Sequence, residues 1–167
     1  MKKIAFILAG FLFLMVSCSY EPGVSEAFTK YRFKDGVTTI SVPGWAIRLI
    51  AGLNELDESD REILDVIDKV TVIAVEDEAL NESINLHNEF YDKISSNDKY
   101  EELMKVNNDD ENVTIFGVME DNVITEMLIL VGGDDNALVY VKGEISPELL
   151  NNKISLTNPE KLISLNF

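Results

Sequence analysis

Five segments of the chain have the hydrophobic pattern of β-strands. Residues 37–42 are rich in β-branched side chains and stop at Pro43-Gly44, and residues 70–75 form a short apolar run. Three further segments follow one another closely, at 113–119, 123–131 and 137–143. The polar segments between these three are as short as hairpin connections, so they predict an antiparallel three-strand meander.

Apolar residues at spacings of three and four predict the helices. Residues 45–53 carry Trp45, Leu49 and Leu53 on one face. Ser59 with Glu62 forms a capping box, which predicts a second helix over 60–68.

Two more helices are predicted before the meander, over 80–94 and over 98–106. The first has its apolar stripe at helical spacing, in Leu80, Ile84, His87, Tyr91 and Ile94. After the meander, Ser146-Pro147 and Asn158-Pro159 each look like an N-cap followed by proline, and they predict two short terminal helices.

This order of elements predicts an α+β fold. Helices gather in the first part of the chain and hairpins in the second. That order favours a two-layer sandwich with helices on one face of a largely antiparallel sheet of about five strands. A doubly wound parallel sheet would need helices between the last strands, and the gaps there are too short for them.

The N-terminus has the form of a lipoprotein signal peptide. Lys2-Lys3 precedes an unbroken apolar or small run over 4–16, and Met15-Val16-Ser17-Cys18 has the form of a lipobox. As a helix this run would be about 20 Å long, too short for a bilayer core of about 30 Å. We therefore expect a signal peptide over 1–17, cleavage between Ser17 and Cys18, and a lipid anchor on Cys18.

The remaining chain divides into a tether and one domain. Residues 18–27 include Pro22-Gly23 and few apolar side chains, and they are expected to form the lipidated tether. Residues 28–167 are expected to form a single α+β domain of ordinary size. Cys18 is the only cysteine, so it has no disulfide partner within the chain. Lipidation would account for a lone cysteine in an exported protein. The alternative is ordinary secretion with cleavage after Ser19.

The charge balance is strongly acidic. The chain has 30 acidic and 14 basic residues and a formal net charge of −16. Without a basic stripe, nucleic acid is not expected as a partner. The acidity is that expected of a solvated surface, with cation binding or a basic partner as the alternatives. No cofactor is expected. The expected partners are the membrane, through the N-terminal lipid, and an unknown envelope protein.

Several segments resemble a known family. They are Phe28-Thr29-Lys30-Tyr31 before Gly36-Val37, Ile40-Ser41-Val42, and the stretches 100–104, 126–131 and 139–145. In these segments the chain resembles the small Bacteroidetes lipoproteins that are grouped as a domain of unknown function. The resemblance spans nearly the whole chain after the leader. It implies an envelope lipoprotein of α+β fold and brings no catalytic residues.

His87 is the only histidine in the chain, and two roles are open for it. Its place near the apolar stripe of a helix is typical of a packing residue, and the alternative is a ligand or catalytic role. One histidine and one lipidated cysteine are too few for a usual zinc site. No Gly-x-Ser-x-Gly turn is present, and no metal site is expected.

Acidic side chains form three clusters, at 76–78, 109–111 and 134–135. Their consecutive spacing points alternate residues apart, and no calcium-loop motif is present. They are expected to be solvated loops, with a weak divalent-cation site as the alternative.

Glu126 is the one charged residue on the apolar side of the strand over 123–131, beside Ile124, Leu128 and Leu130. It is either exposed, or paired with a lysine such as Lys142, or a functional acid in a cleft. It is the candidate cleft acid of the chain.

These observations favour a lipid-anchored protein of the bacterial cell envelope, with the domain in the periplasm. Its domain is expected to be a non-enzymatic binding or interaction module, without catalytic residues. The alternatives are an envelope hydrolase that uses Glu126 with His87, and a weak divalent-cation-binding protein.

Overall fold

The protein is described here from a computed structural model, in residues 23–53, 58–108 and 110–149. The strands are β1 (Val37–Pro43), β2 (Ile67–Val75), β3 (Glu101–Asn107), β4 (Glu111–Glu120), β5 (Val123–Gly133) and β6 (Ala137–Ile145). The helices are α2 (Val24–Tyr31), α3 (Gly44–Leu53), α4 (Glu58–Asp65), α5 (Glu78–Ser83) and α6 (Leu86–Ser95).

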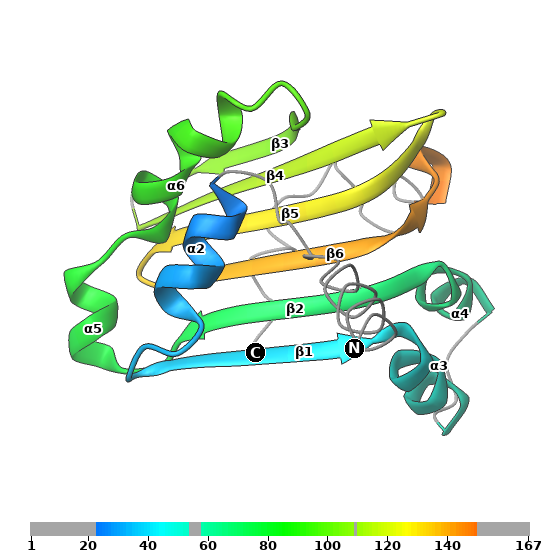
Figure 1. Ribbon diagram of the computed structural model, residues 1–167, viewed down its shortest axis with the longest axis horizontal. Helices are drawn as coiled ribbons and strands as arrows, with labels where there is room; N and C mark the ends of the chain where they lie inside the picture. The colour runs from blue at the N-terminus through cyan, green and yellow to red at the C-terminus, as the bar shows by residue number, and fades with distance from the viewer. Residues whose placement is uncertain (1–22, 54–57, 109, 150–167) are drawn as a thin grey trace, which may run out of the picture.

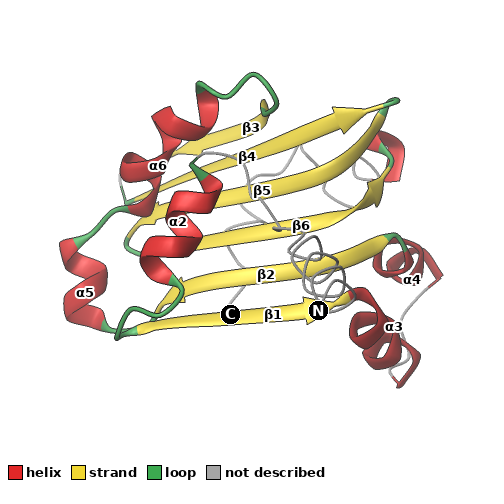
Figure 2. Cartoon of the chain, in the orientation of Figure 1, coloured by secondary structure: helices red, strands yellow, loops and turns green. Residues whose placement is uncertain are grey.

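The strands form one six-stranded sheet in the order β1-β2-β6-β5-β4-β3 (Figure 2). Every neighbouring pair is antiparallel. The predicted α+β class is confirmed, with one strand more than the five predicted. The predicted meander is confirmed as β4, β5 and β6.

Helices α2 and α6 cover one face of the sheet (Figure 1). The main core lies between these helices and the sheet, where Tyr31, Phe90, Phe116, Leu128 and Leu138 are fully buried. A second apolar cluster includes Ile67, Ile115, Met127 and Val141, with Ile47 of α3 and Ile63 of α4 packed against it. Helices α3 and α4 lie at the end of the sheet where β1 ends and β2 begins (Figure 1).

The tight turn between β4 and β5 supports the predicted hairpin. Asp121 and Asn122 have φ values of 50° and 65°, both in the left-handed region. A two-residue type I′ turn requires this conformation at both positions, and Asp and Asn tolerate it better than other side chains with a Cβ.

The helix predicted over 98–106 is wrong. Asn97 to Tyr100 forms a turn, in which the Tyr100 N–H donates to the Asn97 carbonyl at 3.0 Å. The chain then enters β3, which pairs with β4 along the edge of the sheet. Glu, Leu, Met and Lys have strong helix propensity, but pairing with β4 outweighs it.

Two other helix predictions had the wrong limits. The helix predicted over 80–94 is two helices, because the chain is extended at Ile84 and Asn85 (φ −128° and −140°). The helix predicted over 60–68 ends as α4 at Asp65, and β2 starts at Ile67.

The first helix, α2, lies partly in the segment predicted as a tether. It begins at Val24, and Val24 and Ala27 are 0% and 1% exposed in the main core. The structured domain therefore starts at least four residues before the predicted boundary at residue 28. The remaining N-terminal expectations, the signal peptide over 1–17 and Cys18, lie outside the described residues.

The two predicted terminal helices have different outcomes. The Leu149 N–H donates to Ser146 Oγ at 3.2 Å, and residues 147–149 are helical, so Ser146 is an N-cap. Asn158-Pro159 lies outside the described residues.

Candidate functional site

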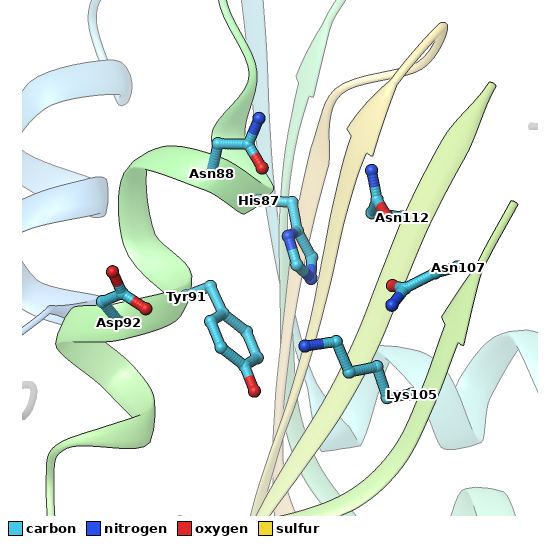
Figure 3. A pocket seen from close by; sticks show the side chains of 7 residues that line it. All are labelled: His87, Asn88, Tyr91, Asp92, Lys105, Asn107 and Asn112. Atoms are coloured by element: carbon cyan, nitrogen blue, oxygen red, sulfur yellow. The ribbon is translucent and has the colours of Figure 1, made fainter. Parts of the chain in front are cut away.

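A polar pocket of about 300 Å³ opens between helix α6 and strands β3 and β4 (Figure 3). Helix α6 contributes one wall, and β3 and β4 contribute the other. The side chains that line it are His87, Asn88, Tyr91, Asp92, Lys105, Asn107 and Asn112.

Helix α6 is fixed on the sheet by its inner face and by its first turn. Leu86, Phe90 and Ile94 are at most 1% exposed. Asn85 caps the helix by accepting a hydrogen bond from the Asn88 N–H at 2.8 Å. His87 and Tyr91, one turn apart, consequently face the pocket.

Asn136 connects the start of α6 to the turn between β5 and β6. Its side chain is 2% exposed. Oδ1 accepts from the Leu86 N–H at 2.7 Å, and Nδ2 donates to the carbonyls of Ile84 and Gly133, both at 3.2 Å. One side chain therefore satisfies backbone groups of the α5–α6 junction and of the sheet turn.

Gly132 allows this close approach of helix and strand. A Cβ at this position would lie 2.4 Å from Asn85 Oδ1 and 2.6 Å from the His87 nitrogen. Gly132 thus has a packing role beside the N-terminal turn of α6, whereas a Cβ at Gly133 would meet the backbone of Asp110 and Glu111.

His87 is 5% exposed and has two neighbours that fix its ring. Nε2 lies 2.8 Å from Thr114 Oγ1, and the ring stacks on Tyr91 with centroids 5.1 Å apart. Burial, with a smaller effect from the charge of Lys105, lowers the pKa of His87 below its ordinary value of 6.5. The imidazole is therefore neutral at neutral pH, and its contacts are those of the packing residue expected from the sequence.

Tyr91 joins the two walls of the pocket. Its hydroxyl donates to Glu102 Oε2 at 2.8 Å, and Lys105 Nζ lies 3.8 Å from the centre of its ring. The ammonium thus lies over the π-face in a cation–π contact. His87, Tyr91 and Lys105 form a stack that crosses from α6 to β3 (Figure 3).

The pocket lining offers hydrogen-bonding groups and charges of both signs. Three amides, at Asn88, Asn107 and Asn112, offer both donors and acceptors, while Lys105 adds one positive charge and Asp92 one negative charge. The hydroxyl that is hydrogen-bonded to His87 belongs to Thr114, which is 0% exposed. A small polar group is the ligand that such a lining could hold.

Glu126, the candidate cleft acid, is half-buried away from this pocket. Its Oε2 accepts a hydrogen bond from the Tyr100 hydroxyl at 3.1 Å, and its Cα pairs with that of Lys142 on β6. It also pairs with Val118 on β4, four residues along the strand from Thr114, the partner of His87. Four residues of strand span about 13 Å.

Phe116 of β4 pairs with Leu128 of β5, and both side chains are buried. This pair lies between Glu126 and Thr114 along the two strands. Glu126 and His87 therefore do not converge, and the pair imagined for a hydrolase is not assembled.

The acidic clusters have structural or solvent contacts. Asp77 caps α5 by accepting from the Leu80 N–H at 2.8 Å, and Asp134 and Asp135 are exposed. Burial, and then the charges of Asp135 and Asp134, raise the pKa of Glu111. In the described part of the chain, no group of three or more His, Cys, Asp or Glu side chains is placed to hold a metal ion. Asp109 lies outside that part.

Sequence reasoning identified His87 but missed most of its surroundings. Tyr91 was assigned to the same helix stripe, whereas Lys105 was assigned to a helix and Asn136 to a loop. Their roles depend on strand pairing between β3 and β4 and on the turn after β5, which bring together residues distant in sequence. Apolar periodicity carries no signal for such polar contacts.

The single histidine allows a direct test of its state. Because its folded pKa lies below 6.5, the stability that its neutral form contributes is complete above about pH 6.5. It is lost as the pH falls through the window below that value, because the unfolded state then binds the proton more tightly.

We expect the free energy of unfolding to fall more steeply below about pH 6.5 in the wild type than in His87→Phe. Urea titrations over this range measure it. The His87 ring signals in NMR should titrate below the ordinary value. Equal pH slopes in the two proteins would contradict the buried, neutral histidine.

Within the described residues, no helix combines the length and the hydropathy needed to cross a membrane.

The chain belongs to a family that the comparisons identify. The family described as Domain of unknown function (DUF4252) matches residues 31–152, from the end of α2 through all six strands. This match covers 122 of the 167 residues, counted from 31 to 152. It confirms the resemblance to a family of unknown function. No curated protein and no solved structure matches the chain.

Proposed function

We propose that this DUF4252 chain is a lipid-anchored protein of the bacterial cell envelope whose domain is a non-enzymatic binding or interaction module. The observation that carries the proposal is the lipobox form of Met15-Val16-Ser17-Cys18 behind Lys2-Lys3 and a short apolar run. Cys18 is the only cysteine, so no disulfide competes for it.

The start of the structured domain supports an anchor that holds the domain near the bilayer. Helix α2 begins at Val24, which leaves the six residues from Cys18 to Gly23 as the connection. Even fully extended, six residues reach only about 20 Å. A diacylglycerol with a further acyl chain on the new N-terminus would hold such a domain stably.

The geometry of the pocket supports binding rather than hydrolysis. Its lining offers amides, one lysine and a neutral histidine, and the acid Glu126 lies elsewhere on the sheet. The pocket could therefore hold a polar group of an envelope partner without transforming it. We propose the periplasm as the site of action, because the leader exports the chain and the lipid retains it.

Replacing Cys18 by alanine tests the anchor. We expect Cys18→Ala to leave the membrane fraction and to incorporate no radioactive palmitate, because the acceptor thiol is gone. Ser17→Ala is the matched control: it keeps a small residue before Cys18 and should remain membrane-bound and labelled. A Cys18→Ala protein that stays in the membrane after a high-salt wash would show that the anchor proposal is wrong.

A further inference from the structure

Helix α3 presents an apolar ridge to the solvent. Trp45, Leu49 and Ile50 are 67%, 59% and 57% exposed. Ile40, on the strand that leads into this helix, is 54% exposed. Single exposed apolar residues are ordinary, but a group of large ones on one helix indicates an interaction surface. We call Trp45, Ala46, Leu49 and Ile50 the α3 ridge.

The ridge is a consequence of helical geometry and of how α3 is held. At 100° per residue the four side chains cover an arc of about 140°, while Ile47 and Ala51 lie on the opposite, buried side. Arg48 points to neither face: its guanidinium donates to the carbonyls of Asp65 and Ile67, both at 3.2 Å. The helix is thus fixed at the corner of the sheet (Figure 1), and the exposure of Trp45, Leu49 and Ile50 places its ridge on the solvent side.

The charge pattern around the ridge differs from that of the rest of the chain. The chain has 30 acidic residues, yet none of them lies between Gly36 and Asn54. Arg48 is the only charged residue in that interval. A solvated face of so acidic a protein would be expected to carry carboxylates. Their absence indicates that this surface is removed from water when the protein binds its partner.

We propose that the α3 ridge inserts into the headgroup layer of a phospholipid bilayer. Trp is favoured at this boundary because its ring is apolar and its N–H is polar. A helix of 10 residues lying in the interface buries its apolar face about 5–10 Å deep. The ridge would provide a second attachment and orient the domain; this rests on the proposed function, since the lipid on Cys18 is what brings the ridge to the membrane.

The charge of the whole chain favours a bilayer over a second copy as the occupant. Two copies, each with a net charge of −16, repel each other, whereas a zwitterionic bilayer has no net charge. The same charge predicts weaker attachment to anionic lipid. Insertion should therefore be strongest in phosphatidylcholine and should decrease as phosphatidylglycerol is added at low salt, where screening is weakest.

Trp45 is the only tryptophan in the chain, so its fluorescence reports on the ridge alone. The purified full chain is mixed with vesicles of phosphatidylcholine whose acyl chains carry bromine, which quenches tryptophan on contact. We expect most of the Trp45 emission to be lost with brominated lipid. With ordinary lipid, the emission should shift to shorter wavelength and become protected from acrylamide.

Leu49→Glu should abolish the quenching, because it places a carboxylate in the middle of the ridge. Phe33→Glu is the matched control, since Phe33 is 88% exposed outside the ridge. It should be quenched like the wild type. Loss of quenching in both variants, or quenching retained in Leu49→Glu, would overturn the proposal.

Two further results would also overturn it. One is Trp45 emission that stays unchanged with vesicles. The other is a blue shift that appears without vesicles and grows with protein concentration, which would assign the ridge to a second copy. Membrane fractionation keeps this test separate from the anchor. Leu49→Glu should still fractionate with membranes through Cys18, whereas failure of the Cys18→Ala test would leave the quenching result standing.

Discussion

Replacing Phe90 by alanine should lower the free energy of unfolding by about 3–5 kcal/mol, the usual cost of removing a buried aromatic ring. Phe90 is 0% exposed, and its ring packs edge-to-face on Tyr31 with centroids 6.0 Å apart. It is therefore one of the contacts through which α6 holds α2 over the main core. Since a domain is stable by only about 5–15 kcal/mol, the loss would be a large fraction of the total.

Phe33→Ala provides the matched control for this measurement. Phe33 is 88% exposed, so the same truncation should change stability by no more than about 0.5 kcal/mol. Urea unfolding followed by circular dichroism gives both values. Equal losses in the two variants would contradict the position of Phe90 at the centre of the core.

The acidic side chain beside Phe90 adds a pH-dependent link between the same two helices. Glu89 accepts hydrogen bonds from Lys30 at 2.5 Å and from Tyr31 at 2.6 Å. Its burial raises its pKa, but these partners outweigh that effect and leave the pKa below its ordinary value. The stability that this link contributes is therefore complete above about pH 4.5. It is lost as the pH falls through the lower pKa of Glu89 in the folded state.

The part of the fold that could be predicted from the sequence is the part with strong local signals. The strands β4, β5 and β6 alternate or run apolar over seven or more residues and are separated by short polar turns, so their pairing follows directly. β1 and β2 were predicted from β-branched runs, and α3 from the spacing of Trp45 and Leu49. For β2 and the meander, local pattern and tertiary environment agree, whereas in α3 the face that carries Trp45 and Leu49 is exposed.

The failures occur where tertiary contacts decide. Residues 101–107 are good helix formers, yet they lie in β3 because β4 offers an edge to pair with and Leu103 packs over Gly117. Helix α2 was missed because Pro22-Gly23 reads as a linker, although Gly23, with φ 89°, directly precedes the helix. The burial of Val24, Ala27, Phe28 and Tyr31 in the main core makes this helix part of the domain.

Of the residues that line the candidate pocket, the sequence singles out only His87 for a site role, and there it favours packing; the candidate cleft acid, Glu126, lies elsewhere. Its wall on α6 follows from helical periodicity. The opposite wall depends on the pairing of β3 with β4, and β3 had been predicted as a helix. The polar contacts that hold the pocket together could not be predicted, because the sequence does not distinguish an asparagine that bonds across the fold from one that is solvated in a turn. Asn136 is the clearest example.

Asn136→Ala should cost about 2–4 kcal/mol, because it leaves several backbone groups without partners, each costing about 1–3 kcal/mol when buried. The Leu86 N–H loses its acceptor, and the carbonyl of Ile84 loses a donor. The start of α6, and with it His87, would no longer be tied to the turn after β5. Asn107→Ala is the matched control. Asn107 is exposed, and its truncation should change stability by no more than about 0.5 kcal/mol.

Asn136→Asp sharpens this prediction through its pH dependence. The variant keeps the oxygen that accepts from the Leu86 N–H. Its second oxygen replaces the Nδ2 that donates to Asn81 Oδ1 and to the carbonyls of Ile84 and Gly133. These three acceptors then face another acceptor instead of a donor. The buried carboxyl should therefore have a pKa well above the ordinary Asp value of about 3.9. Relative to wild type, the variant should lose stability as the pH rises from about 4 towards 7, because ionisation is harder in the folded state. Chemical denaturation of Asn136→Asp and of the exposed control Asn107→Asp across this range measures the effect. A loss of stability independent of pH, or the same slope in both variants, would show that Asn136 is not the buried donor that joins α6 to the sheet.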